Sequence, residues 1–334
     1  MSSGMGSVPL LLRPAGKDYL WGGRRLKDDF SKELNMTPLA ETWECSTHPD
    51  GVSLVSGGEF DGMSLPEVLK AHPEYYGAHP RDDGQLPIMV KLIDAAGDLS
   101  VQVHPNDDYA FRYENGQLGK SEMWYVLDAA PDSSLVYGLR RSVTAEALRE
   151  AIEEERLEGL LQKVPIRKND VFFIEAGKIH AIGAGALVAE IQENSNLTYR
   201  LYDYGRRDKD GNLRQLHLDK ALEVADLEAA GVPRQPMRVL RYSPGMAREL
   251  LGRCRYFEVH RMLINTERCK NMARYSPDRI SFRVLLCIDG CGTINCPGAD
   301  NSSFCFFKGD CIFVPADAGE LFIHGKAVFL DIKG

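Results

Sequence analysis

The sequence predicts a mostly β-stranded protein, folded as a sandwich or barrel, and two observations carry that prediction. Short strand-like runs separated by turn residues dominate the chain from one end to the other. Helical periodicity covers only a few segments. With 334 residues, the chain is long enough for one large domain or two of ordinary size.

The strands expected in the first part of the chain alternate with turn residues such as Gly, Pro, Asn and Asp. They lie at 52–55, 86–93, 99–103, 123–127, 134–137, 171–174 and 187–191.

Helices are expected at three places. The first begins at Ser64, which can cap it, with Pro66 near its start and Glu67 in the capping-box position, and it ends near residue 71. The clearest helix spans 144–162, with Thr144 as its cap. Its apolar stripe consists of Leu148, Ile152, Leu157, Leu160 and Leu161. A shorter helix is expected at 217–224.

A domain boundary is expected near 229–236, which is rich in small residues and Pro. We therefore divide the chain into residues 1–235, with helical decoration, and residues 236–334, a smaller β domain. No recognisable set of metal ligands occurs in the second part. Its expected strands are 257–264, 282–288, 304–308, 311–314, 320–324 and 328–332.

Composition narrows the function classes. The formal charge is −8 and no stripe of Lys and Arg stands out, which disfavours nucleic acid as a partner. No apolar run approaches the length of a membrane span or of a signal-peptide core, so we expect a cytoplasmic protein with no membrane partner.

The eight cysteines are concentrated near the end of the chain, with seven between Cys254 and Cys311. A disulfide framework is possible on count alone, but without a signal peptide or a CxxC pair we expect reduced thiols on strands. A zinc knuckle at Cys287, Cys291 and Cys296 would need a further ligand that we cannot identify, so these three are expected to be small buried residues.

Four side chains of metal-binding type lie on or beside expected strands: Gln102, His104, Glu122 and His180. Gln102 and His104 are two residues apart, so on a strand they point to the same face. Two histidines and a carboxylate suit a divalent transition metal such as zinc. Few nearby cysteines and room for an open coordination position favour a catalytic site over a structural one.

The arrangement around these residues resembles the two half-motifs of the cupin barrel, a jelly-roll fold. A polar turn at 168–170 leads into the strand 171–174, and Gly177 then allows a bend before His180. The stretch 308–316 is similar but lacks the matching His and Glu. The resemblance implies two cupin barrels, the first decorated by a few helices and the second free of metal.

A longer series of motifs is more specific. The chain resembles the type I mannose-6-phosphate isomerase (phosphomannose isomerase) family, in its short bacterial form, strongly over about residues 10–225 and weakly in the tail. The motifs occur in order as Trp-Gly-Gly at 21–23, Ala-Glu-Thr-Trp-Glu at 40–44, Lys-Leu-Ile at 91–93, 99–105, Gly-Lys-Ser-Glu-Met-Trp at 119–124, Gly-Lys-Ile-His-Ala-Ile-Gly at 177–183, and 190–200.

The resemblance implies an enzyme that interconverts mannose 6-phosphate and fructose 6-phosphate through a cis-enediol, with one zinc ion per chain. It implies Gln102, His104, Glu122 and His180 as zinc ligands and Arg200 as the catalytic arginine. The general base stays open between Glu190, Lys120 and a histidine of the ligand shell. Substrate-pocket positions carry over onto Trp21, Glu41, Lys91 and Ser100.

Two other functions are compatible with a cupin pocket. A non-catalytic sugar-phosphate sensor could keep the cupin pocket, although the presence of all four ligands and Arg200 disfavours it. A cupin that uses iron and oxygen is disfavoured by Gln as a ligand and by a pocket containing Lys and Arg. The expected partner is a small-molecule sugar phosphate, and the expected state is a monomer or weak homo-oligomer.

Overall fold

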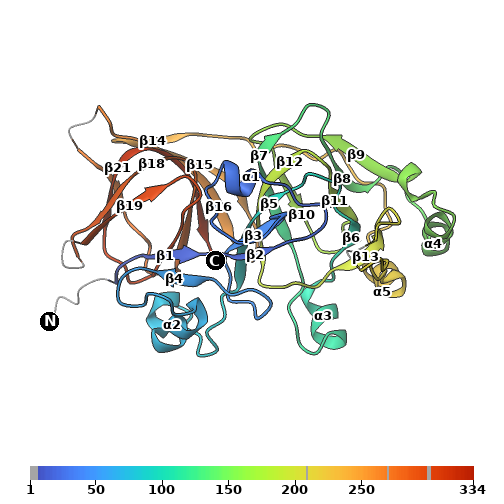
Figure 1. Ribbon diagram of the computed structural model, residues 1–334, viewed down its shortest axis with the longest axis horizontal. Helices are drawn as coiled ribbons and strands as arrows, with labels where there is room; N and C mark the ends of the chain where they lie inside the picture. Colours follow the sequence, from blue (N-terminus) through green and yellow to red (C-terminus); the bar gives the residue numbers. More distant parts are fainter. Residues whose placement is uncertain (1–6, 208–209, 269–270, 299–301) are drawn as a thin grey trace.

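The computed structural model describes residues 7–207, 210–268, 271–298 and 302–334, and it confirms the mostly β fold class. Figure 1 shows two strand-rich halves side by side, with the C-terminal strands in one half and most of the earlier strands in the other. The strands form three sheets, and all pairings between strands of these sheets are antiparallel.

The first half pairs two sheets face to face. The six-stranded sheet contains, in order, β10 (Val171–Ile174), β7 (Glu122–Ala129), β12 (Ala186–Glu193), β5 (Ile88–Asp94), β3 (Glu41–Cys45) and β2 (Ala15–Lys17). The five-stranded sheet contains β13 (Tyr199–Tyr202), β6 (Val101–Val103), β11 (His180–Ile182), β8 (Ser134–Leu139) and β9 (Leu161–Pro165). One apolar cluster between them takes Trp124 and Val188 from the first sheet and Leu135 and Ile182 from the second.

The ten-stranded sheet builds the second half. Its main path is β14 (Arg241–Ser243), β15 (Met246–Arg253), β16 (Glu258–Asn265), β21 (Leu321–Lys333), β18 (Arg283–Cys296), β20 (Cys311–Val314), β1 (Leu10–Arg13) and β4 (Leu54–Ser56). Beside this path, β17 (Ala273–Tyr275) pairs with β21 and β19 (Ser302–Phe307) pairs with β18. Because β1 and β4 join this sheet, the start of the chain contributes to both halves; the division at residue 235 stays a prediction.

One strand replaces two that the sequence predicts near the end of the chain. The expected strands 320–324 and 328–332 are both part of β21. Gly325 connects them with a φ of 136°, and a side chain there would meet the carbonyl oxygen of Cys291. A residue without a Cβ therefore allows the strand to continue where the sequence pattern shows a break.

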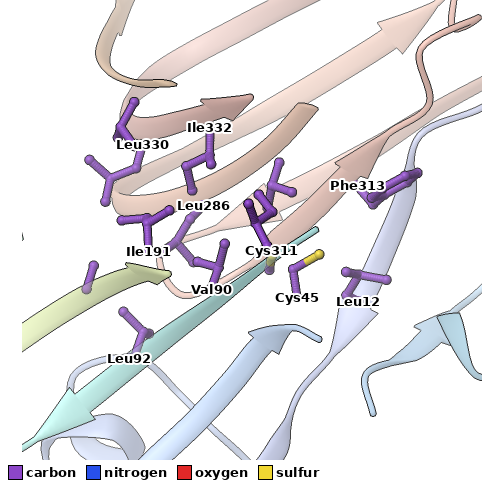
Figure 2. Packing of buried hydrophobic residues seen from close by; sticks show 14 of the residues in the cluster. Leu12, Cys45, Val90, Leu92, Ile191, Leu286, Cys311, Phe313, Leu330 and Ile332 are labelled. Atoms are coloured by element: carbon purple, nitrogen blue, oxygen red, sulfur yellow. The ribbon is translucent and has the colours of Figure 1, made fainter. Parts of the chain in front are cut away.

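The two halves share an apolar core because side chains of the six-stranded sheet point alternately to its two faces. On β5, Val90 and Leu92 face the ten-stranded sheet, whereas Ile93 belongs to the cluster inside the first half. Figure 2 shows Val90, Leu92 and Ile191 opposite the C-terminal strands, which supply Leu286, Leu330 and Ile332. Burial on both faces explains why β5 and β12 are buried along their whole length.

Ile191→Ala is expected to destabilise the protein by about 2–5 kcal/mol, because it removes a fully buried side chain from the core between the halves. Chemical denaturation of the wild-type protein and of the variant measures the difference in their free energies of unfolding. Leu213→Ala is the matched control, since Leu213 is 57% exposed, and should change stability by less than about 0.5 kcal/mol. Equal effects of the two substitutions would contradict this packing.

Some of the helices lie where the sequence predicts them. The capping box at Ser64 and Glu67 is present on α2 (Leu65–Ala71), which is followed by a 3-10 turn, η1 (Pro73–Tyr76). The helix α5 (Leu218–Val224) also lies where expected. Two short helices were not predicted: α1 (Arg25–Asp28) and α3 (Asp107–Tyr113). On α3 only Ala110 is buried, so the sequence offers no apolar stripe.

The predicted helix 144–162 is wrong in its second half. Thr144 does cap α4, but α4 (Ala145–Glu153) ends early, and Glu155 adopts a left-handed φ of 56°. A 3-10 turn, η2 (Leu157–Gly159), follows, and Leu161 begins β9, which pairs with β8. The leucines are buried as expected, but strand pairing overrides the helical periodicity.

The described cysteines are free thiols, as expected. Cys287 and Cys296 are buried, but the prediction for Cys291 is wrong, because it is exposed where β18 extends into the hairpin with β19. Cys269 lies outside the described residues. Within the described ranges, no helix is long and apolar enough to cross a membrane.

Candidate active site

The site lies inside the first half, and strand alternation builds it. On β6, Val101 and Val103 pack outward into the cluster shared with α4 and α5. The residues of opposite parity, Ser100, Gln102 and His104, therefore point inward. On β7 the same rule turns Glu122 and Trp124 inward, away from the core between the halves.

Three predicted ligands meet there. His104, Glu122 and His180 are each at most 1% exposed, and the ligand atoms they offer lie within 4.8 Å of one another. Glu122 Oε2 is 3.7 Å from His104 Nε2, and Glu122 Oε1 is 3.4 Å from His180 Nε2. Residues far apart in the sequence thus present two imidazole nitrogens and a carboxylate to one point.

The two histidine rings are oriented by backbone carbonyls. His104 Nδ1 donates to Leu197 O and His180 Nδ1 donates to Lys178 O, each at 2.7 Å. These bonds leave both Nε2 atoms free of a proton and directed at the carboxylate. Burial lowers the pKa of both rings, that of His180 to about 4, so both are neutral near pH 7. Neutral, fixed imidazoles are ready metal ligands.

The Glu122 carboxylate lacks a full set of partners. Its Oε1 is buried without a hydrogen bond from any described residue, while its Oε2 accepts from Lys120. Burial, assisted by the charge of Glu190, raises the pKa of Glu122 to about 7. A divalent cation between the three side chains would satisfy Oε1 and both ring nitrogens, so the donor set fits a transition metal.

Gln102 lies beside this cluster. Its carboxamide nitrogen is 3.3 Å from His180 Nε2, and its Oε1 accepts from Ser100 Oγ at 3.4 Å. A carboxamide can rotate to exchange nitrogen for oxygen, and the oxygen is the atom that a metal would take. The structure thus brings the fourth predicted ligand to the same place.

Charged groups surround the cluster. Lys120 Nζ lies 3.1 Å from His104 Nε2 and 3.7 Å from Glu190 Oε1, and Lys91 Nζ lies 3.4 Å from the same Glu190 oxygen. Burial opposes the charge on Lys120, but Glu122 and Glu190 outweigh it and raise its pKa. Burial likewise opposes the charge on Glu190, but Lys120 and Lys91 outweigh it and lower its pKa. Both groups are therefore held in their charged forms.

Two indoles fix the carboxylates of the wall. Trp124 Nε1 donates to Glu190 Oε2 at 3.0 Å, and Trp43 Nε1 donates to Glu41 Oε2 at 2.8 Å. Lys91 also lies 3.8 Å from Glu41 Oε2. These bonds give Glu41 and Glu190 set positions.

A cavity of about 230 Å³ opens beside the cluster. Gln102 and Lys120 line this cavity and also contact the histidines of the cluster. The predicted residues that line the cavity are Trp21, Glu41, Lys91, Ser100, Gln102, Lys120, Glu190 and Arg200. Trp21 is also 4% exposed and part of the apolar cluster, so it is a core aromatic and a wall residue at once.

Arg200 lines this cavity opposite Gln102, its partner on the paired strands. Its Nε donates to Ser100 Oγ at 3.2 Å and its guanidinium donates to the Gln215 carbonyl at 2.9 Å. Burial, together with the charge of Arg214, lowers its pKa. The side chain is thus held without a direct carboxylate contact among the described residues.

The cavity is also lined by residues that the sequence did not indicate as site residues, among them Tyr19, Asn196, Thr198 and Arg214. Tyr19 lies against Trp21 with ring centroids 5.6 Å apart. For Arg214 the only signal in the sequence is its place in a segment rich in arginine after Arg200. Such a segment is usually a solvated surface, which is why sequence reasoning missed it.

Comparisons with known proteins agree with this geometry. Residues 10–128 match the family model "Phosphomannose isomerase type I, catalytic domain". The chain is 35% identical to mannose-6-phosphate isomerase ManA of Bacillus subtilis over 97% of this chain and 98% of that protein. It is 34% identical to the mannose-6-phosphate isomerase of Streptococcus mutans over 77% of this chain and 79% of that protein.

A solved structure gives the same result for the fold. The crystal structure of the mannose 6-phosphate isomerase from Bacillus subtilis superposes with a TM-score of 0.89 at 32% identity. The superposition covers 98% of this chain and 99% of that chain. The similarity therefore extends over both halves.

Proposed function

The chain belongs to the type I phosphomannose isomerase family, and from that premise we propose that it interconverts mannose 6-phosphate and fructose 6-phosphate. The observation that carries the proposal is the buried cluster of His104, Glu122 and His180 at the side of a charged cavity. The cavity is of a size for a small polar ligand, and its walls combine acids and bases.

We further propose zinc as the metal, one ion per chain, held by Gln102, His104, Glu122 and His180. Two neutral imidazoles and a carboxylate are a donor set that catalytic zinc commonly uses. When bound, the ion would supply Lewis-acid polarisation of the sugar carbonyl and hold the two oxygens at C1 and C2.

The proton transfer between C1 and C2 is assigned to Glu190 and Lys120. Glu190 lines the cavity as a carboxylate, with Oε2 fixed by Trp124 and Oε1 toward the lysines, so it can accept a proton. Lys120 carries a proton that it can share with an oxygen of the enediol. Arg200, beside Gln102 on the paired strands, supplies positive charge where the enediolate develops.

We propose a cytoplasmic protein that acts on a small-molecule sugar phosphate, without nucleic acid or membrane partners, as a monomer or weak homo-oligomer. Its formal charge of −8 supports the exclusion of nucleic acid.

The isomerase function is tested by incubating the zinc-loaded protein with mannose 6-phosphate in deuterated water. Proton NMR should show fructose 6-phosphate forming, with deuterium entering at the carbon that is reprotonated. A sugar-phosphate sensor would bind the compound and leave its spectrum unchanged. That outcome would overturn the proposed function in favour of binding alone.

A further inference from the structure

Two arginines line the cavity in addition to the buried Lys91 and Lys120. They are Arg200 and Arg214. Arg214 lies 3.4 Å from Asp203 Oδ1, and Arg206 makes its ion pair with the same oxygen. The buried carboxylate of Asp203, 5% exposed, therefore holds both Arg206 and Arg214. Within the described ranges, the hydrogen bonds of the Arg200 side chain go only to neutral groups.

The two lysines are balanced in a different way. Lys91 and Lys120 lie against the carboxylates of Glu41, Glu122 and Glu190. With a bound dication, the two lysines, the three carboxylates and the ion would together carry a net charge of about +1. Of the two arginines that line the cavity, Arg214 shares Asp203 with Arg206, and Arg200 contacts no carboxylate among the described residues. A phosphate monoester carries about −1.5 to −2 at pH 7 and would balance them.

Arg200 lies close to the metal cluster, because it pairs with Gln102 across the strands and its Nε donates to Ser100 Oγ, which itself donates to Gln102 Oε1. Arg214 lines the same cavity and is held by Asp203 instead. Arg214 is therefore the arginine of this cavity that is left for the phosphate.

We propose that Arg214, positioned by Asp203, binds the phosphate group of the substrate and makes the enzyme select phosphorylated over free hexose. The inference rests on the proposed function for the identity of the sugar. Arg200, opposite Gln102 on the paired strands, keeps its place near the reacting carbons. A guanidinium fork matches two phosphate oxygens, which a lysine cannot do in the same way.

The test replaces Arg214 in the full-length zinc-loaded protein. Arg214→Gln should raise the dissociation constant of inorganic phosphate, measured by calorimetry, by about tenfold to a hundredfold. It should raise the KM for mannose 6-phosphate more than it lowers kcat, and it should lower kcat/KM for free mannose much less than kcat/KM for mannose 6-phosphate. Arg214→Lys should give an intermediate loss. Thermal unfolding shows whether each variant is folded.

Arg207→Gln is the matched control, because Arg207 comes from the same segment but bonds to the Gly211 carbonyl and does not line the cavity. It should leave phosphate affinity within about threefold of wild type, as expected for an exposed charge. An equal loss in this variant would show a diffuse field rather than a contact, and would overturn the assignment to Arg214.

The outcomes separate the two proposals. If wild-type protein isomerises mannose 6-phosphate but Arg214→Gln keeps its phosphate affinity and KM, the phosphate assignment is wrong and the isomerase function stands. If wild-type protein has no isomerase activity but loses phosphate binding on Arg214→Gln, the isomerase function is wrong and the anion site stands. No phosphate binding by wild type, with an unchanged KM in the variant, also overturns the assignment.

Discussion

Glu122→Gln is expected to remove isomerase activity by more than about 10³-fold, because a Lewis-acid metal contributes several kcal/mol to such a reaction. Glu122 is fully buried and is the one carboxylate in the cluster with the two histidines. The amide keeps the shape of the side chain but loses the charge that a dication requires. Elemental analysis of the purified variant should find metal well below one ion per chain.

The control for this substitution is Glu153→Gln. Glu153 is exposed on α4 and is neither a predicted ligand nor a residue of the cavity wall. This variant should retain full metal and activity. His104→Ala should reproduce the loss seen in Glu122→Gln, since it removes another ligand. Full metal content and wild-type activity in both ligand variants would remove the metal assignment altogether.

Glu190→Gln is expected to lower kcat by about 10²- to 10⁴-fold, the usual range for loss of a general base. Unlike the ligand variants, it should retain its metal, because Glu190 contacts Lys91, Lys120 and Trp124 rather than the imidazoles. Steady-state kinetics and metal analysis of one preparation give both quantities.

This prediction separates the candidates for the base. A kcat within about threefold of wild type in metal-replete Glu190→Gln would rule out Glu190. It would leave Lys120 or a histidine of the ligand shell for the role. Loss of metal together with activity would instead show that Glu190 supports the cluster and does not itself transfer the proton.

The fold could be predicted where the side-chain pattern alone decides it. Most strands and the capped starts of α2 and α4 lie where apolar runs and capping residues placed them. The sequence does not show which strands pair. Pairing with β8 takes Leu161 into β9 and ends the predicted helix, and pairing with β20 takes β1 into the second half. Both outcomes depend on residues far away in the chain.

More of the candidate site than of the strand pairing around it could be predicted, because metal binding restricts which residue types can take part. His104, Glu122 and His180 are recognisable as ligands, and the structure does bring them together with Gln102. The place of Arg214 in the cavity wall could not be predicted, because it depends on Asp203 and on how the chain folds. An arginine in a charged loop has no pattern that distinguishes it from a surface residue.

We propose that this chain isomerises mannose 6-phosphate only when it holds its metal. The most direct measurement is the rate of fructose 6-phosphate formation by purified protein as isolated, after complete chelation, and after zinc is added back. We predict activity that is lost on chelation and restored by zinc. Absence of activity in zinc-replete protein, or full activity after the metal is removed, would contradict the account.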